Sequence, residues 1–144
     1  MKRIPIYIIL IGMVFFAPVD RVDVGTLQPV EILAISKEEG MNVVRTDTDD
    51  MGIGKTVEQA LDDLKQTAPG VIYLDTAEFL LIEKGCEQEA ESLKQWLRKT
   101  VRVCSTQGNI DLKDAVKYLR AHGGFPKLCQ WKITQKLPVL TTEK

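Results

Sequence analysis

An alternation of short apolar runs with amphipathic segments, from Val30 to Leu140, is the strongest constraint on the fold. Val30–Ser36 and Met41–Thr46 read as two strands that pair as a hairpin around the turn at Glu38-Glu39-Gly40. Later apolar runs also fit strands, namely Val71–Leu74, Phe79–Ile82, Val101–Cys104 and Leu128–Ile133, although Phe79–Ile82 could instead open a helix. The polar stretch Asp47–Gly54 between these groups is expected to be a loop.

Three segments have the spacing of amphipathic helices. The best defined starts at Thr56-Val57-Glu58-Gln59, which has the form of a capping box, and stops before Pro69-Gly70. The second is Glu87–Lys99, and the third is Asp111–Ala121, where Asp111 is a good N-cap. Strands that alternate with helices after a hairpin predict an α/β (α+β) fold, a single domain with a mixed β-sheet covered by about three helices.

The amino terminus predicts export. Lys2 and Arg3 are followed by Ile4–Val19, which carries no charge, and Asp20 then ends the run. As a helix this run spans about 24 Å, short of the roughly 30 Å of a bilayer core, which favours a signal peptide. Because Ala17-Pro18-Val19 is a poor cleavage site, an uncleaved membrane anchor is an open alternative. A third interpretation of the run is a buried strand or core helix of a cytosolic protein.

These features divide the chain into four parts: a signal peptide or anchor at 1–19, a linker at 20–29, an α/β domain at 30–140 and a tail at 141–144. Beyond residue 19 the chain has 17 basic and 20 acidic side chains. Nucleic-acid binders usually carry a basic excess, so nucleic acid is excluded as a partner. Other membrane or envelope proteins are the expected partners, with membrane contact through the N-terminal segment.

The Gly52-Ile-Gly54-Lys55-Thr56 stretch invites comparison with a phosphate-binding loop. That motif needs a glycine five positions before its Gly-Lys-Thr, where this chain has Asp49 flanked by Asp47 and Asp50. The carboxylates would repel a phosphate. We therefore interpret the stretch as a tight turn followed by a threonine helix cap.

The same stretch partly matches a calcium-binding loop. Asp47 and Asp49 occupy positions one and three, a glycine occupies position six, and Glu58 occupies position twelve. Met51 at position five cannot bind a cation, and Lys55 at position nine adds a positive charge. These three carboxylates are the candidate metal ligands, and we expect them to bind calcium no more tightly than about millimolar.

No catalytic residue and no cofactor is predicted. The sole histidine, His122, falls at a helix end before Gly123-Gly124, where a cation is ordinary helix chemistry. Asp75 and Glu78 fit an acid–base pair but are typical of turn or cap residues. The cysteines lack metal-site spacing, their pairing is left open, and each is interpreted as a small buried residue: Cys86, Cys104 and Cys129.

Three segments together resemble a known family: Gly54–Leu61 (GKTVEQAL), Val71–Leu74 (VIYL) and Phe79–Ile82 (FLLI). Their order is similar to that in the N-terminal domain of the C subunit of Ger-type spore germinant receptors, over Val30 to Ala121. The resemblance implies a membrane-associated, non-catalytic protein of a spore-forming bacterium that works in a receptor complex. This chain departs from the family in having no lipoprotein cysteine before Cys86 and no further domains.

The sequence thus predicts a non-catalytic domain, secreted or tethered to the membrane outside the cytoplasm, that acts through protein interaction. A sporulation or germination membrane complex is its implied setting. Two alternatives stay open at this point. One is an extracytoplasmic ligand- or metal-binding protein that uses the Asp47–Glu58 loop, and the other is a cytosolic enzyme of unknown class.

Overall fold

The computed structural model describes residue 12 and residues 24–140 of the chain. Apart from Gly12, the Ile4–Val19 run predicted as signal or anchor lies outside the described residues, as does the predicted tail at 141–144. Among the residues that are described, no helix has the length and apolar character needed to cross a bilayer. Within residues 24–140, eight strands and three α-helices follow a short 3-10 helix at Val24–Thr26.

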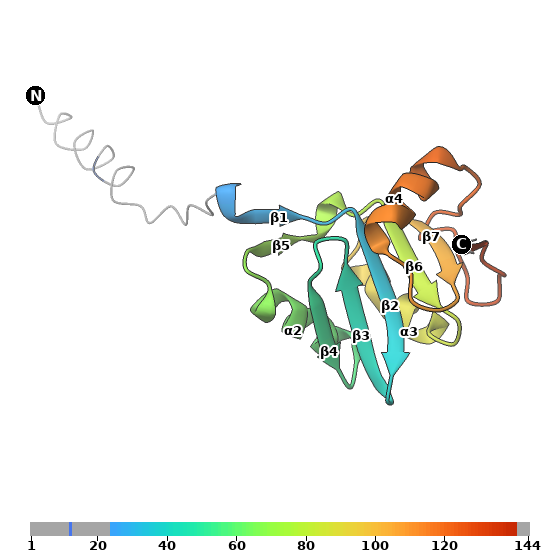
Figure 1. Ribbon diagram of the computed structural model, residues 1–144, viewed down its shortest axis with the longest axis horizontal. Coiled ribbons are helices and arrows are strands. Elements are labelled where there is room, and N and C mark those ends of the chain that lie inside the picture. The colour runs from blue at the N-terminus through green and yellow to red at the C-terminus, as the bar shows by residue number, and fades with distance from the viewer. Residues whose placement is uncertain (1–11, 13–23, 141–144) are drawn as a thin grey trace, which may run out of the picture.

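The main sheet has six strands in the order β4-β3-β2-β6-β7-β8 (Figure 1). Its first three strands are antiparallel: β2 (Ile32–Glu38), β3 (Met41–Thr46) and β4 (Met51–Gly54). The other three continue from β2 in parallel: β6 (Phe79–Glu83), β7 (Arg102–Thr106) and β8 (Val139–Leu140). The predicted hairpin and mixed sheet are therefore confirmed.

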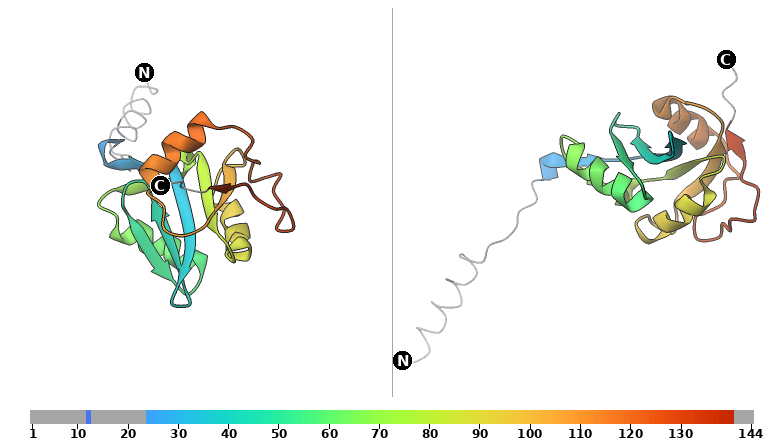
Figure 2. Two further views of the ribbon diagram at one scale, coloured as in Figure 1. Left: turned by 45° about the vertical axis from the view of Figure 1, so that its right-hand side comes forward. Right: turned by 90° about the horizontal axis from the view of Figure 1, so that it is seen from below.

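Helices cover both faces of this sheet (Figure 2). On one face, α2 (Val57–Thr67) and α3 (Glu87–Ser92) pack into the larger apolar cluster, while α4 (Leu112–Ala121) packs into a smaller cluster on the other face. Alternation along β2 supplies both clusters, because Leu33 belongs to the larger and Ile32 to the smaller. The predicted mixed sheet covered by three helices is the observed architecture.

Helix α2 begins as its sequence predicts. Thr56 is the N-cap, and its hydroxyl accepts a hydrogen bond from the Gln59 amide at 3.3 Å. The Gln59 side-chain oxygen accepts in return from the amide of Lys55, one residue before the cap, at 3.2 Å. One amide of the first helical turn, and the amide of Lys55 just before the cap, are therefore satisfied by side chains.

The predicted loop at Asp47–Gly54 is wrong in its second half, because Met51–Gly54 forms the edge strand β4. A Cβ atom on Gly52 would lie 2.0 Å from the Ala60 carbonyl oxygen, and one on Gly54 would lie 2.4 Å from the Ala60 amide nitrogen. The two glycines therefore allow the backbone of α2 to lie directly against β4. Their function is close packing.

Helix α2 also closes the outer edge of β4. The Asp63 carboxylate accepts a hydrogen bond from the Ile53 amide at 2.9 Å, and the Thr67 hydroxyl donates to the Met51 carbonyl at 3.4 Å. An edge strand with open amide and carbonyl groups invites pairing with another chain. Here those groups are bonded within the domain.

The predicted strand at Leu128–Ile133 is also wrong. This segment forms turns, and next to it only Lys127 makes an isolated bridge, to Arg102. The Trp131 amide donates a hydrogen bond to the Lys127 carbonyl at 3.0 Å, so these residues form a single helical turn. The turn buries the side chains of Leu128 and Trp131 on one side. Residues three apart share a side in such a turn, whereas a strand would place them on opposite faces.

Two further differences concern the sheet that β5 joins and the end of α3. Val71–Tyr73 forms β5, which pairs in parallel with β1 (Leu27–Pro29) as a separate two-stranded sheet and does not join the main one. The last residues of the predicted linker thus form a strand. The helix predicted to reach Lys99 stops at Ser92 and continues as a 3-10 turn at Leu93–Gln95.

Candidate functional site

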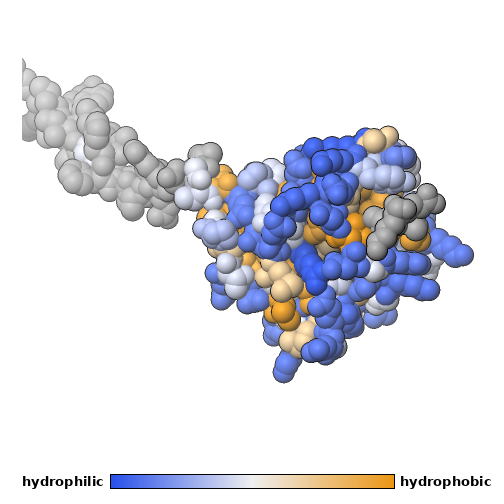
Figure 3. Space-filling model, viewed as in Figure 1, coloured by the Kyte–Doolittle hydropathy of each residue, from blue (hydrophilic) through white to orange (hydrophobic). Residues whose placement is uncertain are grey.

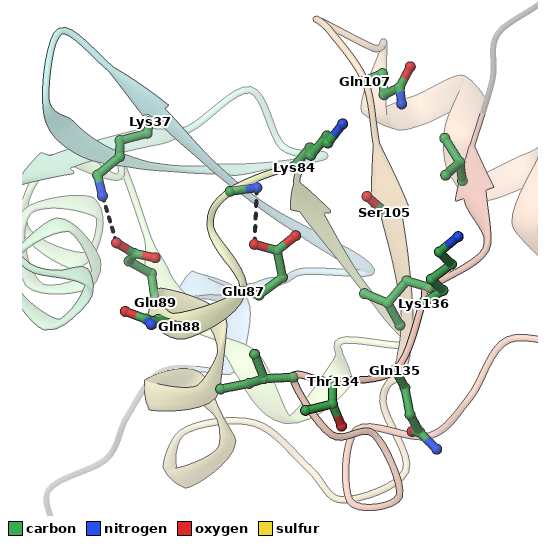
Figure 4. A pocket seen from close by; sticks show the side chains of 14 residues that line it. Lys37, Lys84, Glu87, Gln88, Glu89, Ser105, Gln107, Thr134, Gln135 and Lys136 are labelled. Carbon is green, nitrogen blue, oxygen red and sulfur yellow. Dashed lines mark hydrogen bonds and ion pairs between the residues drawn. The ribbon is translucent and has the colours of Figure 1, made fainter.

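A large hollow of the described surface lies at the carboxyl ends of β2, β6 and β7, beside the start of β8. Its volume is about 770 Å³, and we call it the strand-end crevice. Lys37 of β2, Ser105 of β7 and Val139 of β8 line it, together with Lys84 immediately after β6. The start of α3 and the segment before β8 form its walls (Figure 4).

The chain leaves β6 and β7 towards opposite faces of the sheet. After β6 it enters α3, whose Ala90 belongs to the larger cluster, and after β7 it enters α4, whose Leu119 belongs to the smaller one. Adjacent parallel strands whose connections diverge in this way open a crevice between the two loops, and ligands of open α/β sheets bind at such a point. The strand-end crevice includes residues from both loops.

Glycines with positive φ form both turns. Gly85 (φ 98°) follows β6, and Gly108 (φ 84°) follows β7. No atom lies within 4 Å of a Cβ position built on either residue, so the space above both turns is open. Gly85 and Gly108 adopt a left-handed backbone conformation that favours glycine, whereas Gly52 is a glycine because α2 packs closely against it.

One ion pair sits at the β2 side of the crevice. The Lys37 ammonium lies 2.7 Å from the Glu89 carboxylate. This hydrogen bond and the opposite charge lower the pKa of Glu89 and raise the pKa of Lys37. The two charges largely cancel, so this pair closes one end of the crevice without a net charge.

Two other lysines of the crevice are not paired. Lys84 and Lys136 are exposed, and neither makes a hydrogen bond or ion pair to another described residue. Figure 4 shows Lys84 where the chain leaves β6, and Lys136 on the side of β8. The Glu87 carboxylate accepts a hydrogen bond from the Gly85 amide at 3.0 Å. Hydroxyl and amide groups of Ser105 and Gln107 also line the crevice, so it can bind an anionic ligand that accepts hydrogen bonds.

A second hollow, of about 690 Å³, lies at the amino ends of the strands. Two of its three carboxylates are already paired, because the Arg120 guanidinium lies 3.0 Å from Glu78 and 3.3 Å from Glu31. The Arg98 side chain donates to the Asp75 carbonyl at 3.2 Å. We therefore regard the strand-end crevice, with its unpaired lysines, as the better candidate site.

The three carboxylates predicted as metal ligands are not brought together. Asp47 and Asp49 belong to the β3–β4 turn, whereas Glu58 lies beyond the other end of β4, in the first turn of α2. The Asp47 carboxylate accepts from the Glu31 amide at 3.0 Å, and that of Asp49 lies 2.5 Å from the Lys113 ammonium. Within residues 24–140 no group of three metal-binding side chains is found.

Side chains considered for catalysis also have local structural contacts. His122 caps α4, and its ring stacks on Tyr118 with centroids 4.0 Å apart. Burial raises the pKa of the Cys86 thiol to about 11 and that of Cys104 to about 12. The expectation that each cysteine is buried is wrong for Cys129, which is exposed; all three are free thiols.

Sequence reasoning missed Lys84, Ser105 and Lys136. One signal was present in the sequence: both inner strands, Phe79–Glu83 and Arg102–Thr106, are followed two residues later by a glycine. Turn glycines at the ends of apolar strands are typical of the loops that form ligand sites in α/β folds. Nothing in the local pattern of Lys136 marks it, because it lies in a polar stretch between the apolar run Leu128–Ile133 and Leu137.

Comparison with other proteins assigns neither a family nor a function to this chain. No family model matches this chain, and neither a curated protein nor a solved structure matches it. The resemblance to the germinant-receptor C subunit is neither supported nor refuted by these comparisons.

Proposed function

We propose that the protein is a non-catalytic interaction domain, outside the cytoplasm, held at the membrane by its N-terminal segment or secreted after cleavage. Lys2, Arg3 and the uncharged Ile4–Val19 run support export. The strand-end crevice supports binding, and it is the observation that carries the proposal. A sporulation or germination membrane complex is the setting that the family resemblance suggests.

The groups around the crevice favour binding over catalysis. Its polar lining side chains are lysines, amides, hydroxyls and carboxylates, and the Lys37–Glu89 ion pair favours the charged forms of both groups. Catalytic acids and bases usually have pKa values moved towards neutrality. The shifts at this pair run in the opposite direction, which suits a fixed charge pattern for recognition.

Export can be tested with reporter fusions. Alkaline phosphatase fused after Lys144 is expected to be active in cells, because it folds only outside the cytoplasm. The matched fusion carries a fluorescent protein that fails to mature after export. An inactive phosphatase fusion together with a bright fluorescent one would contradict export.

The binding role can be tested by crosslinking in living cells. A photoreactive amino acid in place of Gln107 is expected to give a discrete adduct with one envelope protein. The matched control carries the same group at Lys99, an exposed position before β7 at the other end of the sheet. Equal adducts from both positions, or adducts from neither, would contradict a role for the crevice.

A further inference from the structure

We infer that the strand-end crevice binds an acidic, extended peptide segment of a partner protein, about four to five residues long. This inference rests on the proposed interaction function and specifies the partner's chemistry. It follows from three properties of the crevice, which are its length, its charge and its mixed lining.

The length is set by the strands beneath the crevice. Lining residues come from the ends of β2, β6, β7 and β8, which are consecutive neighbours in the sheet. Three spacings of about 4.8 Å give roughly 14 Å from the first strand to the last. An extended chain advances by about 3.3–3.6 Å per residue, so four to five residues cross the four strand ends.

The charge is positive at this place on an otherwise acidic chain. Lys84 and Lys136 face the crevice without a carboxylate partner among the described residues, while Lys37 is neutralised by Glu89. Glu87 is the one other carboxylate of the lining and keeps its charge while it accepts from the Gly85 amide, so three lysines and two glutamates give the crevice a net charge of +1. Complementary charge steers association and selects partners. Two separated ammonium groups select a segment with carboxylates at both ends.

The lining between the two lysines suits a peptide better than a simple anion. Ser105 and Gln107 offer hydroxyl and amide groups that can bond to peptide backbone. Beside them Ile133 and Val139, exposed by 44% and 48%, form an apolar strip that can pack against an aliphatic side chain. A small dicarboxylate would contact the lysines and leave this strip uncovered.

Fluorescence anisotropy tests the inference on the full chain in mild detergent. The probe is the labelled pentapeptide Glu-Ser-Glu-Leu-Glu, with Lys-Ser-Lys-Leu-Lys as its charge-reversed counterpart. Saturable binding of the acidic peptide is expected, weakening as salt rises because the contacts are exposed. The variant Lys84→Glu/Lys136→Glu is expected to bind at least about tenfold more weakly.

The matched control is Lys99→Glu/Lys127→Glu, which makes the same charge change at the opposite end of the sheet. This control is expected to bind like the parent, within about twofold, since distant exposed charges are screened. All four positions are exposed, and circular dichroism of both variants checks that the fold is kept. Equal weakening by the two double variants would overturn the site.

Three other results would also overturn the inference: no saturable binding below 1 mM peptide, equal binding of the basic peptide, or lysine-dependent binding of glutarate without binding of the peptide. The last result would assign the crevice to small anions. Failure here remains distinguishable from failure of the proposed function, because crosslinking at Gln107 and the reporter fusions do not depend on the peptide's charge.

Discussion

The β4–α2 edge and the strand-end crevice both depend on glycines, but they use them in opposite ways. At the edge, Gly52 and Gly54 bring the backbone of α2 against the strand, and side chains of α2 bond the outer amide and carbonyl groups. At the crevice, Gly85 and Gly108 turn the chain with φ above 80° and leave open space above them. One region is closed by the fold, and the other is left open to solvent.

This difference shows why a glycine-rich stretch is a poor guide to a binding site. The Gly52–Thr56 stretch has the composition of a ligand loop, yet its groups are satisfied internally. The crevice is assembled from four strand ends that are far apart in the sequence. Met51 and Ile53 of β4 are each 44% exposed, and Figure 3 shows apolar atoms at the surface in the part of the molecule where β3 and β4 lie.

The largest expected effect is from Gly52→Ala. Its methyl group would lie 2.0 Å from the Ala60 carbonyl oxygen, so α2 must move away from β4. Overpacking of this kind costs about 3 kcal/mol or more when backbone atoms obstruct the new group. Urea denaturation followed by circular dichroism measures the loss.

Gly123→Ala is the matched control. No atom lies within 4 Å of a Cβ atom on Gly123, and its φ is not positive, so its denaturation midpoint should match that of the parent. If Gly52→Ala and Gly123→Ala unfolded at the same urea concentration, the close packing of β4 on α2 would be contradicted.

Thr56→Ala tests the helix cap and should have a smaller effect. Loss of the hydroxyl that accepts from the Gln59 amide is expected to lower the free energy of unfolding by about 1 kcal/mol. Lys55→Ala should be nearly neutral, because the Lys55 side chain is exposed and makes no ion pair within the described part of the chain. A larger cost for Lys55→Ala than for Thr56→Ala would reverse this assignment.

The Lys37–Glu89 pair should contribute little to stability, because both groups are partly solvated. The pKa of Glu89 is lowered from 4.5, so this contribution is present above the unfolded pKa and is lost as pH falls through the lower folded value. Carbon-detected NMR titration should show the Glu89 pKa rising towards 4.5 in Lys37→Met. An unchanged pKa would exclude the ion pair in solution.

Calcium is expected to have no effect on the β4–α2 region at micromolar concentration. Asp47 and Glu58 lie beyond opposite ends of β4, and the Asp47 carboxylate accepts hydrogen bonds from two backbone amides. Calorimetry should detect no binding tighter than about millimolar. A micromolar isotherm that disappears in Asp47→Asn would instead favour the metal-binding alternative.

Local signals in the sequence predicted much of the fold. The β2–β3 hairpin, α2 with its Thr56 cap, α4 with its Asp111 cap and the central strand β6 all follow from periodicity and capping residues. Errors arose where tertiary contacts override local pattern. The Met51–Gly54 stretch is a strand because α2 and β3 pack against it, and Leu128–Ile133 turns because Trp131 is buried under the sheet.

The candidate site was the least predictable part. Lys84 and Lys136 are separated by 52 positions, and only the parallel arrangement of β6, β7 and β8 places them around one crevice. Strand order depends on crossovers that a single sequence does not specify. The acidic residues of the β3–β4 turn were candidate metal ligands because they lie close together in the sequence. In the structure, the Asp47 carboxylate instead accepts hydrogen bonds from the amides at the start of β2.

Mapping of the bound peptide by NMR tests the central claim most directly, because one spectrum reports on both regions at once. On addition of Glu-Ser-Glu-Leu-Glu to the labelled full chain, amide shifts are expected to change at Lys84, Ser105 and Gln107. The amides of Gly52 and Gly54 should not change. Shifts confined to the Asp47–Glu58 region, with the crevice amides unmoved, would contradict the assignment of the strand-end crevice as the binding site.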